Sequence, residues 1–390
     1  MNRYVKNAVR FGLYKILFPL QYRRYRNCPL DRKKAVFIEM ERETLPESMD
    51  YLYHVMEKEG RYDLHVHYIR QRHVGQKRLA ANICRCLKDM ATARFVFLCE
   101  GNRFVSCISP RKETMIVQLW HGCGAFKRFG FSTAQYRFGG SRREYVKYPY
   151  YKNYDYVTVS SPSVAWAYRE AMNLSEESGV IRPIGVSRTD VYFQEKFLED
   201  CRQKIQKAYP WIQGRRILLY APTFRGQVGT AAAPAGPDIA QMAEKLSDRY
   251  VLLIKQHPLV KERPALSREY QNFAADVSEE QSIETLLCVS DICISDYSSL
   301  VFEYSLFERP MIFFACDLEE YEDWRGFYYD YQELTPGPVL RTTEQLVDYI
   351  LHIEERFDAE CVKKFREKFM SACDGHATER LLKLLENGEK

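Results

Sequence analysis

Long apolar runs and paired-cysteine motifs are both missing from this sequence of 390 residues. No stretch reaches the roughly 18 consecutive apolar residues that a helix needs to span a bilayer. Lys15 interrupts the apolar residues near the N-terminus and no small-residue cleavage site follows, so we expect no signal peptide. The twelve cysteines contain no CxxC pair, which favours reduced, mostly buried thiols over disulfides or a zinc site.

Signatures of several common enzyme classes are absent as well. Gly122 and Gly124 follow a predicted strand, but the next glycine is Gly130, which breaks the GxGxxG pattern of dinucleotide-binding folds. The sequence also has no GxxxxGK[ST] loop, no GxSxG elbow and no HExxH pair. Hydride transfer, P-loop hydrolysis, serine hydrolysis and zinc-protease chemistry are therefore disfavoured.

Acidic residues are absent from the first thirty positions, and Asp31 is the first of them. Apolar residues recur at helical spacing in this stretch, between seven basic residues: Arg3, Lys6, Arg10, Lys15, Arg23, Arg24 and Arg26. A basic amphipathic helix can lie in the headgroup region of an anionic membrane. We therefore predict that residues 1–33 hold a peripheral protein at the cytoplasmic face of the cell membrane; an ordinary helix packed on the protein body is the alternative. Pro19 is expected to kink or end the helix.

Most of the remaining sequence alternates short apolar runs with amphipathic segments, which is typical of parallel sheets covered by helices. Strands are expected at 35–38, 64–68, 95–99, 115–120, 156–159, 217–220, 250–254, 292–295 and 311–314. The length and the 46% of apolar residues suit two α/β lobes, at 34–190 and 191–370. We expect the segment 371–390 to be a helix that can cross back to the first lobe. The net charge of +5 fits an anionic partner without choosing among nucleotide, lipid headgroup and nucleic acid.

A histidine stands at the predicted end of a strand in the block Gln118–Gly130. Two glycines follow His121, and a basic helix is expected to begin after them. Histidine is the side chain whose ordinary pKa suits proton transfer near neutral pH, so His121 is a candidate for deprotonating an acceptor hydroxyl. The alternative, which this motif alone favours, is a structural histidine bonded to a neighbouring carbonyl.

Two further strand ends carry side chains that can bind phosphate. Thr223 and Arg225 follow a strand that runs into Ala-Pro, and arginine makes forked contacts to phosphate oxygens. A surface arginine in a mobile loop is an equal alternative. His257 precedes a proline that holds it in extended geometry, from which it could bond a phosphate oxygen and stabilise a leaving group.

The most informative block is 289–304. A buried strand is expected to end at Asp296, and Ser298 and Ser299 stand where a helix begins. Hydroxyl groups and free backbone N–H groups at such a position bind anions. Glu303 lies one turn further on, placed to reach ribose hydroxyls. A simple serine cap on a core helix is the alternative, and it is compatible with a phosphate site.

Taken in order, these blocks resemble the CDP-glycerol glycerophosphotransferase family, the teichoic acid primases and polymerases. The matching blocks are Trp120-His121-Gly122, Ala221-Pro222-Thr223, His257-Pro258, Asp296-Tyr297-Ser298-Ser299, Arg309–Phe314 and Arg325–Asp330. They cover residues 115–335, and six blocks in one order are far more specific than any one of them.

The resemblance implies a GT-B fold, in which two Rossmann-like lobes with parallel sheets face a central cleft, and chemistry without a catalytic metal or cofactor. It implies transfer of glycerol phosphate, or another polyol phosphate, from CDP-glycerol or CDP-ribitol to a lipid-linked saccharide with release of CMP. By the same resemblance, His121 matches the general base and His257 the histidine that contacts the donor diphosphate. The other expected substrate contacts are Trp120, Gly122, Thr223, Arg225, Asp296, Ser298, Ser299 and Glu303.

The sequence departs from the family pattern at two places. Many members have Thr-Pro after Trp-His-Gly, where this chain has Cys123-Gly124, a difference that could reflect another acceptor. Ser187 stands in place of a proline in the family's GxPRxD block, which affects local turn geometry. The length resembles a primase with one catalytic unit more than a long polymerase. A GT-B glycosyltransferase that uses a nucleotide sugar is the main alternative, and we expect no nucleic acid partner because no such binding motif is present.

Overall fold

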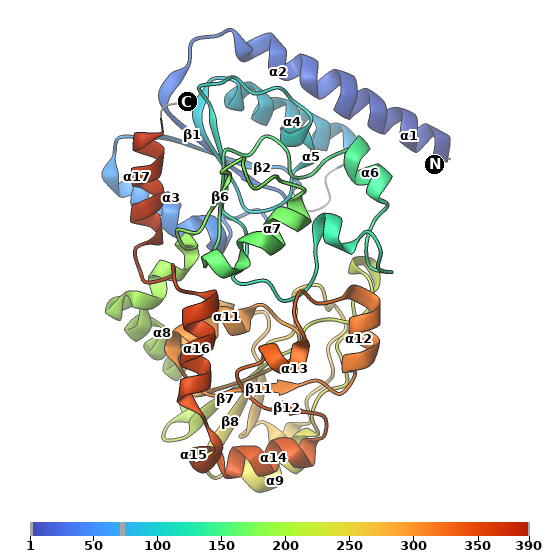
Figure 1. The fold of residues 1–390 in the computed structure, drawn as a ribbon. Coiled ribbons are helices and arrows are strands. Elements are labelled where there is room, and N and C mark those ends of the chain that lie inside the picture. Colours follow the sequence, from blue (N-terminus) through green and yellow to red (C-terminus); the bar gives the residue numbers. More distant parts are fainter. Residues whose placement is uncertain (1–2, 71–74, 389–390) are drawn as a thin grey trace.

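Two α/β lobes make up the protein in the computed structural model, which describes residues 3–70 and 75–388 (Figure 1). Each lobe contains one six-stranded sheet, and the strands pair in the orders β2-β1-β3-β4-β5-β6 and β12-β11-β10-β7-β8-β9. All ten strand pairings are parallel. The predicted pair of lobes with parallel sheets is confirmed.

The first sheet is built from β1 (Asp31–Glu39), β2 (Asp63–Tyr68), β3 (Ala93–Leu98), β4 (Met115–Gln118), β5 (Tyr156–Thr158) and β6 (Ile181–Arg182). Its helices are α3 (Glu47–Glu59), α4 (Gln76–Met90), α5 (Arg103–Ser106), α6 (Arg142–Lys147) and α7 (Ala165–Met172). The central strands are continuous apolar runs because helices cover both faces, and Val36, Phe37, Val96 and Phe97 are fully buried.

The second sheet is built from β7 (Arg216–Ala221), β8 (Tyr250–Ile254), β9 (Ala274–Asp276), β10 (Ile292–Ser295), β11 (Met311–Phe314) and β12 (Val339–Leu340). Its helices are α8 (Glu195–Ala208), α9 (Ile239–Leu246), α10 (Ile283–Val289), α11 (Leu300–Tyr304), α12 (Leu318–Arg325), α13 (Tyr331–Leu334), α14 (Thr343–Leu351), α15 (Ile353–Arg356) and α16 (Ala359–Phe369). The chain enters this sheet at β7, moves outward to β9, and returns to β10 on the other side of β7. This Rossmann order places a switch point between β7 and β10, where ligands bind in such folds.

All nine predicted strands are present, and the structure adds the short strands β6, β9 and β12. These three add two or three residues each at the periphery of the sheets. The helix predicted after Gly124 does not form. Residues 125–129 are not helical, because Lys127 forms an antiparallel bridge with Phe327 of the second lobe.

A helical run crosses the outer side of the first lobe as α1 (Arg3–Phe11), the π-helical η1 (Gly12–Leu17) and α2 (Phe18–Arg26) (Figure 1). Pro19 does not end this run. It lies in the first turn of α2, where a missing N–H is tolerated, and the wider π-helical turns precede it. Phe18 and Tyr22 are buried, whereas seven apolar side chains of the run are exposed: Tyr4, Val5, Val9, Phe11, Ile16, Leu17 and Leu20. Within the described ranges, no helix is long and apolar enough to cross a bilayer.

The last helix, α17 (Ala377–Asn387), follows α16 of the second lobe but lies against the first lobe (Figure 1). Leu381 and Leu385 pack in one apolar cluster with Phe37 of β1. Asp190 accepts the backbone N–H of Thr378 at 2.7 Å. The chain therefore passes between the lobes twice. All twelve cysteines, which fall in the described part of the chain, are free, and seven of them are buried.

Candidate active site

The cleft between the lobes holds two adjoining cavities of about 240 and 370 Å³. Four residues line both of them: His121 from the first lobe, and His257, Ser298 and Ser299 from the second. At Gly122 an added Cβ would lie 3.3 Å from Ser299 Oγ, so the two lobes are in close contact here. The predicted base and the predicted anion-binding serines thus share one cleft.

Trp120 positions His121 through an unusual backbone conformation. Its φ of 61° is in the left-handed region, which costs a non-glycine residue of order 1–3 kcal/mol. A hydrogen bond from the Trp120 backbone N–H to Gln118 Oε1, at 3.0 Å, helps to hold this turn. The Trp120 and His121 rings stack with centroids 4.5 Å apart, so the strained turn places the imidazole against a buried indole.

The hydrogen bonding of His121 suits a general base. Its Nδ1 lies 3.0 Å from the carbonyl oxygen of Cys99, so Nδ1 carries the proton and Nε2 keeps a free lone pair. Desolvation by the surrounding protein lowers the pKa of His121 below its usual value, with a further contribution from Arg188. The alternative of a carbonyl-bonded histidine is therefore also realised. That bond selects the tautomer with a free Nε2, and desolvation favours its neutral form.

His257 shows the opposite tautomer. The backbone N–H of Leu259 donates to His257 Nδ1 at 3.2 Å, which leaves the ring proton on Nε2. Burial, with the nearby charges of Lys127 and Arg325, lowers the pKa of His257 to about 4. A neutral His257 can therefore donate one hydrogen bond into the cleft, which is what an oxygen of a bound phosphate requires.

Ser298 and Ser299 connect β10 to α11, at the switch point of the second sheet. The backbone N–H of Leu300 donates to Ser298 Oγ at 3.4 Å, whereas the Ser299 side chain caps no helical N–H group. Both residues line the two cavities, together with Pro222 or Thr223 from the loop after β7. The predicted anion site therefore combines loops from the two strands that flank the switch point.

Glu303 lies in the wall of the smaller cavity and is held by two neighbours. Its Oε2 accepts a hydrogen bond from the Tyr192 hydroxyl at 3.1 Å and lies 3.4 Å from Nη2 of Arg188. The buried Arg188 also pairs with Glu284 and donates from Nη1 to the carbonyl oxygen of His121 at 3.0 Å. Arg188 thus joins the base of the first lobe to two carboxylates of the second.

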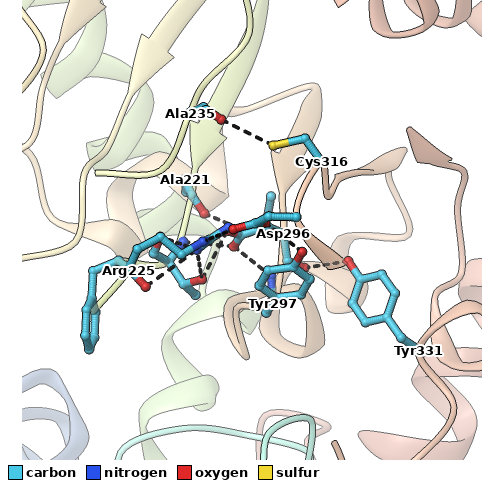
Figure 2. Close-up of polar contacts among 11 residues, drawn as sticks. Ala221, Arg225, Ala235, Asp296, Tyr297, Cys316 and Tyr331 are labelled. Carbon is cyan, nitrogen blue, oxygen red and sulfur yellow. Dashed lines mark hydrogen bonds and ion pairs between the residues drawn. The ribbon is translucent and has the colours of Figure 1, made fainter. Parts of the chain in front are cut away.

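Arg225 and Asp296, two of the expected substrate contacts, line neither cavity. Arg225 Nη2 instead donates to Asp296 Oδ2 at 2.9 Å, and Figure 2 shows these two side chains in contact. A second carboxylate, that of Asp317, accepts from the same nitrogen at 2.9 Å. Asp296 also accepts the Thr223 hydroxyl at 3.0 Å, and the Tyr331 hydroxyl donates to its carbonyl oxygen at 3.0 Å. In this arrangement Arg225 and Asp296 hold the loop after β7 to the end of β10. Thr223, which Asp296 also contacts, lines the larger cavity.

Two cations of the larger cavity were not singled out from the sequence. Lys127 and Arg325 both line it, and Arg325 Nε is buried without a hydrogen-bond partner. Burial and the charge of Arg325 hold the pKa of Lys127 well below its usual value. Both residues lie in matching or neighbouring blocks of the family pattern, but only the folded chain brings them together. Aromatic side chains complete the wall: Trp120, Phe126, Phe129, Phe138, Tyr168 and Phe224.

Comparison with known proteins gives the same family from sequence and from structure. The family model described as CDP-glycerol:poly(glycerophosphate) glycerophosphotransferase matches residues 20–387. The teichoic acid ribitol-phosphate primase of Bacillus spizizenii is 32% identical over 98% of this chain and 96% of its own length. The teichoic acid glycerol-phosphate primase of Bacillus subtilis is 30% identical over 72% of this chain and 70% of its own length.

Longer relatives and a solved structure are also similar. This chain spans 60% of the poly(ribitol-phosphate) polymerase of Bacillus spizizenii, with 31% identity. The solved wall teichoic acid polymerase TagF matches with a TM-score of 0.77 and 23% identity, over 98% of this chain and 95% of that one. That likeness confirms the GT-B fold. The chain belongs to the CDP-glycerol:poly(glycerophosphate) glycerophosphotransferase family.

Proposed function

We propose that the protein transfers a polyol phosphate from a CDP-linked donor to a hydroxyl group of an acceptor, with release of CMP. The observation that carries this proposal is the shared cleft, in which the free Nε2 of His121 belongs to the same cavities as His257 and the serines of the β10–α11 loop. A proton acceptor on one lobe and phosphate-binding groups on the other are the two parts that such a transfer needs.

The donor would lie at the switch point of the second lobe. Ser298, Ser299 and the Nε2–H group of His257 would bind the diphosphate, and Glu303 would accept hydrogen bonds from the ribose. Glu303 is suited to this because Arg188 and Tyr192 hold its carboxylate in one orientation at the cavity wall. Trp120 and Gly122 would shape the opposite wall, and Thr223 would position the loop that contacts the donor.

In the reaction, the acceptor oxygen would attack the phosphorus that carries the polyol, while His121 Nε2 takes its proton. The new P–O bond forms as the bond to the CMP oxygen breaks, and the electron pair leaves with CMP. Arg325 would offset the negative charge on the transferred phosphate. The charge of the bound phosphate would favour the protonated form of Lys127, which would then act beside Arg325. General-base catalysis typically contributes about 10²–10⁴-fold, and charge stabilisation of this kind is usually the larger effect.

The donor assay is the direct test of this proposal. Relatives named for ribitol phosphate and for glycerol phosphate make CDP-ribitol and CDP-glycerol the two candidates. Purified protein incubated with either donor and a lipid-linked disaccharide should release CMP only when the acceptor is present. UDP-linked sugars serve as the control for a glycosyltransferase. Nucleotide release from a UDP-sugar, with none from either CDP-polyol, would contradict the proposal.

We further propose that the protein associates peripherally with the cytoplasmic face of the membrane through the helical run 3–26. Exposed apolar residues and basic residues alternate along this run, and Val146 on the neighbouring α6 is also exposed. The protein should co-sediment with anionic vesicles and be released by salt, because screening weakens surface electrostatics. Equal binding to zwitterionic vesicles, unaffected by salt, would argue against a role for the basic residues.

A further inference from the structure

A third cavity, of about 290 Å³, lies apart from the cleft, on the N-terminal helical run. It shares no lining residue with the two cavities of the active site. Its walls are Lys15, Ile16, Pro19, Leu20, Tyr22, Arg23, Arg26 and Ser109. The seven residues of the run form two series spaced by three or four positions, Lys15-Pro19-Tyr22-Arg26 and Ile16-Leu20-Arg23, and therefore share one broad face. Ser109 of the first lobe adds to the lining.

The charges of this cavity are unbalanced. Lys15, Arg23 and Arg26 line it, and no acidic side chain does. Within the described residues, none of the three cations has a carboxylate within ion-pair distance, whereas Arg10 on the same run pairs with Glu144. Like charges at neighbouring helical positions repel one another. An anion bound among the three would turn that repulsion into attraction.

The rim of the cavity is apolar and open to solvent. Ile16 is 49% exposed and Leu20 is 56% exposed, and both are also lining residues. A soluble anion would use only the three cations and the Ser109 hydroxyl. A phosphate that carries acyl chains would use the cations and would also cover the two apolar side chains, which contributes roughly 25 cal/mol for each Å² buried.

We propose that this cavity is a binding site for the phosphate group of an anionic membrane phospholipid, with the acyl chains passing over Ile16 and Leu20. The proposal rests on the membrane association proposed above and makes it specific, because it replaces a diffuse basic surface with one defined headgroup site. A lipid held there would fix the orientation of the helical run on the membrane and would leave the active-site cleft free.

The decisive experiment compares two variants of the full chain that lose the same charge. Arg23→Gln/Arg26→Gln empties the cavity of two cations, and Lys6→Gln/Arg24→Gln removes two cations from the same run outside it. Each basic residue near an anionic surface contributes about fivefold to affinity, so diffuse attraction predicts equal losses. We expect the cavity variant to bind phosphatidylglycerol vesicles at least roughly tenfold more weakly than the control variant. Circular dichroism and polyol-phosphate transfer to a soluble acceptor should be unchanged in both.

A second measurement separates the possible sources of the phosphate. Short-chain phosphatidylglycerol below its micelle concentration should bind the wild type and the control saturably in calorimetry, and the cavity variant should lose this binding. Equal losses in the two variants would overturn the headgroup site while leaving diffuse membrane association intact. Inorganic phosphate binding as tightly as the lipid, or an isoprenyl diphosphate binding more tightly than phosphatidylglycerol, would also overturn it.

Discussion

Replacing His121 with alanine is expected to lower kcat by about 10²–10⁴-fold while leaving the unfolding transition close to that of the wild type. The expected loss follows from the free Nε2 lone pair of His121, which can take the proton from the acceptor hydroxyl. Of the four residues that line both cavities, His121 is the one from the first lobe. Stability should change little because the ring is open to the cavity rather than packed in the core.

The pH profile gives this prediction a signature that a structural role would not produce. A general base works in its neutral form, so activity should fall as the pH drops through the pKa of His121. Because the protein lowers that pKa, the wild type should keep its activity below the range where an ordinary histidine is protonated. The variant should lose this acid limb. His54→Ala, which removes an exposed histidine on α3, is the matched control, and near-wild-type turnover of a folded His121→Ala protein would remove His121 from the chemistry.

Replacing Arg188 with methionine is expected to lower the free energy of unfolding by about 3–5 kcal/mol, the usual effect of removing one partner of a buried ion pair. The substitution leaves the carboxylates of Glu284 and Glu303 without their cation between the lobes. It also removes the hydrogen bond to the carbonyl oxygen of His121, so kcat/KM should fall in the protein that remains folded.

Denaturant unfolding checks this prediction against a surface pair. Arg202→Met removes an exposed partner of Glu199 and should change stability by no more than about 0.5 kcal/mol. Burial already raises the pKa of Glu284, and losing Arg188 should raise it further. A carboxyl group whose pKa is higher in the folded than in the unfolded state destabilises the folded state when it is ionised. The loss of unfolding free energy in Arg188→Met should therefore become smaller as the pH falls through the raised pKa of Glu284. Adding Glu284→Gln should recover part of the lost stability. An unfolding midpoint of Arg188→Met equal to that of the wild type would contradict a stabilising role for the Arg188 ion pairs.

The fold could be predicted in outline because its strongest signals are local. Eight of the nine predicted strands are largely buried apolar runs, and such runs are visible in any sequence. The ninth, β2, is half-buried and was visible through its alternating pattern. The strands β6, β9 and β12 escaped prediction because two or three residues carry no periodicity. Of the kink or end predicted at Pro19, the end does not occur, because the proline lies in the first turn of α2, directly after the π-helical turns.

The candidate site followed from a related argument about strand ends. His121, His257 and Ser298 each stand just after an apolar run, and the carboxyl ends of parallel strands share one edge of a sheet. What the pattern could not supply was which polar side chains are already paired. Arg225 was expected to contact phosphate, and the structure pairs it with the carboxylates of Asp296 and Asp317, so that it lines neither cavity.

The sequence by itself determined the two lobes, their parallel sheets and the strand ends that carry the candidate histidines and serines, because period and residue type are properties of short segments. The tertiary structure alone decided which tautomer each histidine adopts, which cations face the cleft and which are neutralised, and that Arg188 joins the two lobes. These features depend on contacts between residues far apart in the chain, and an electrostatic environment exists only once the chain has excluded water from between them.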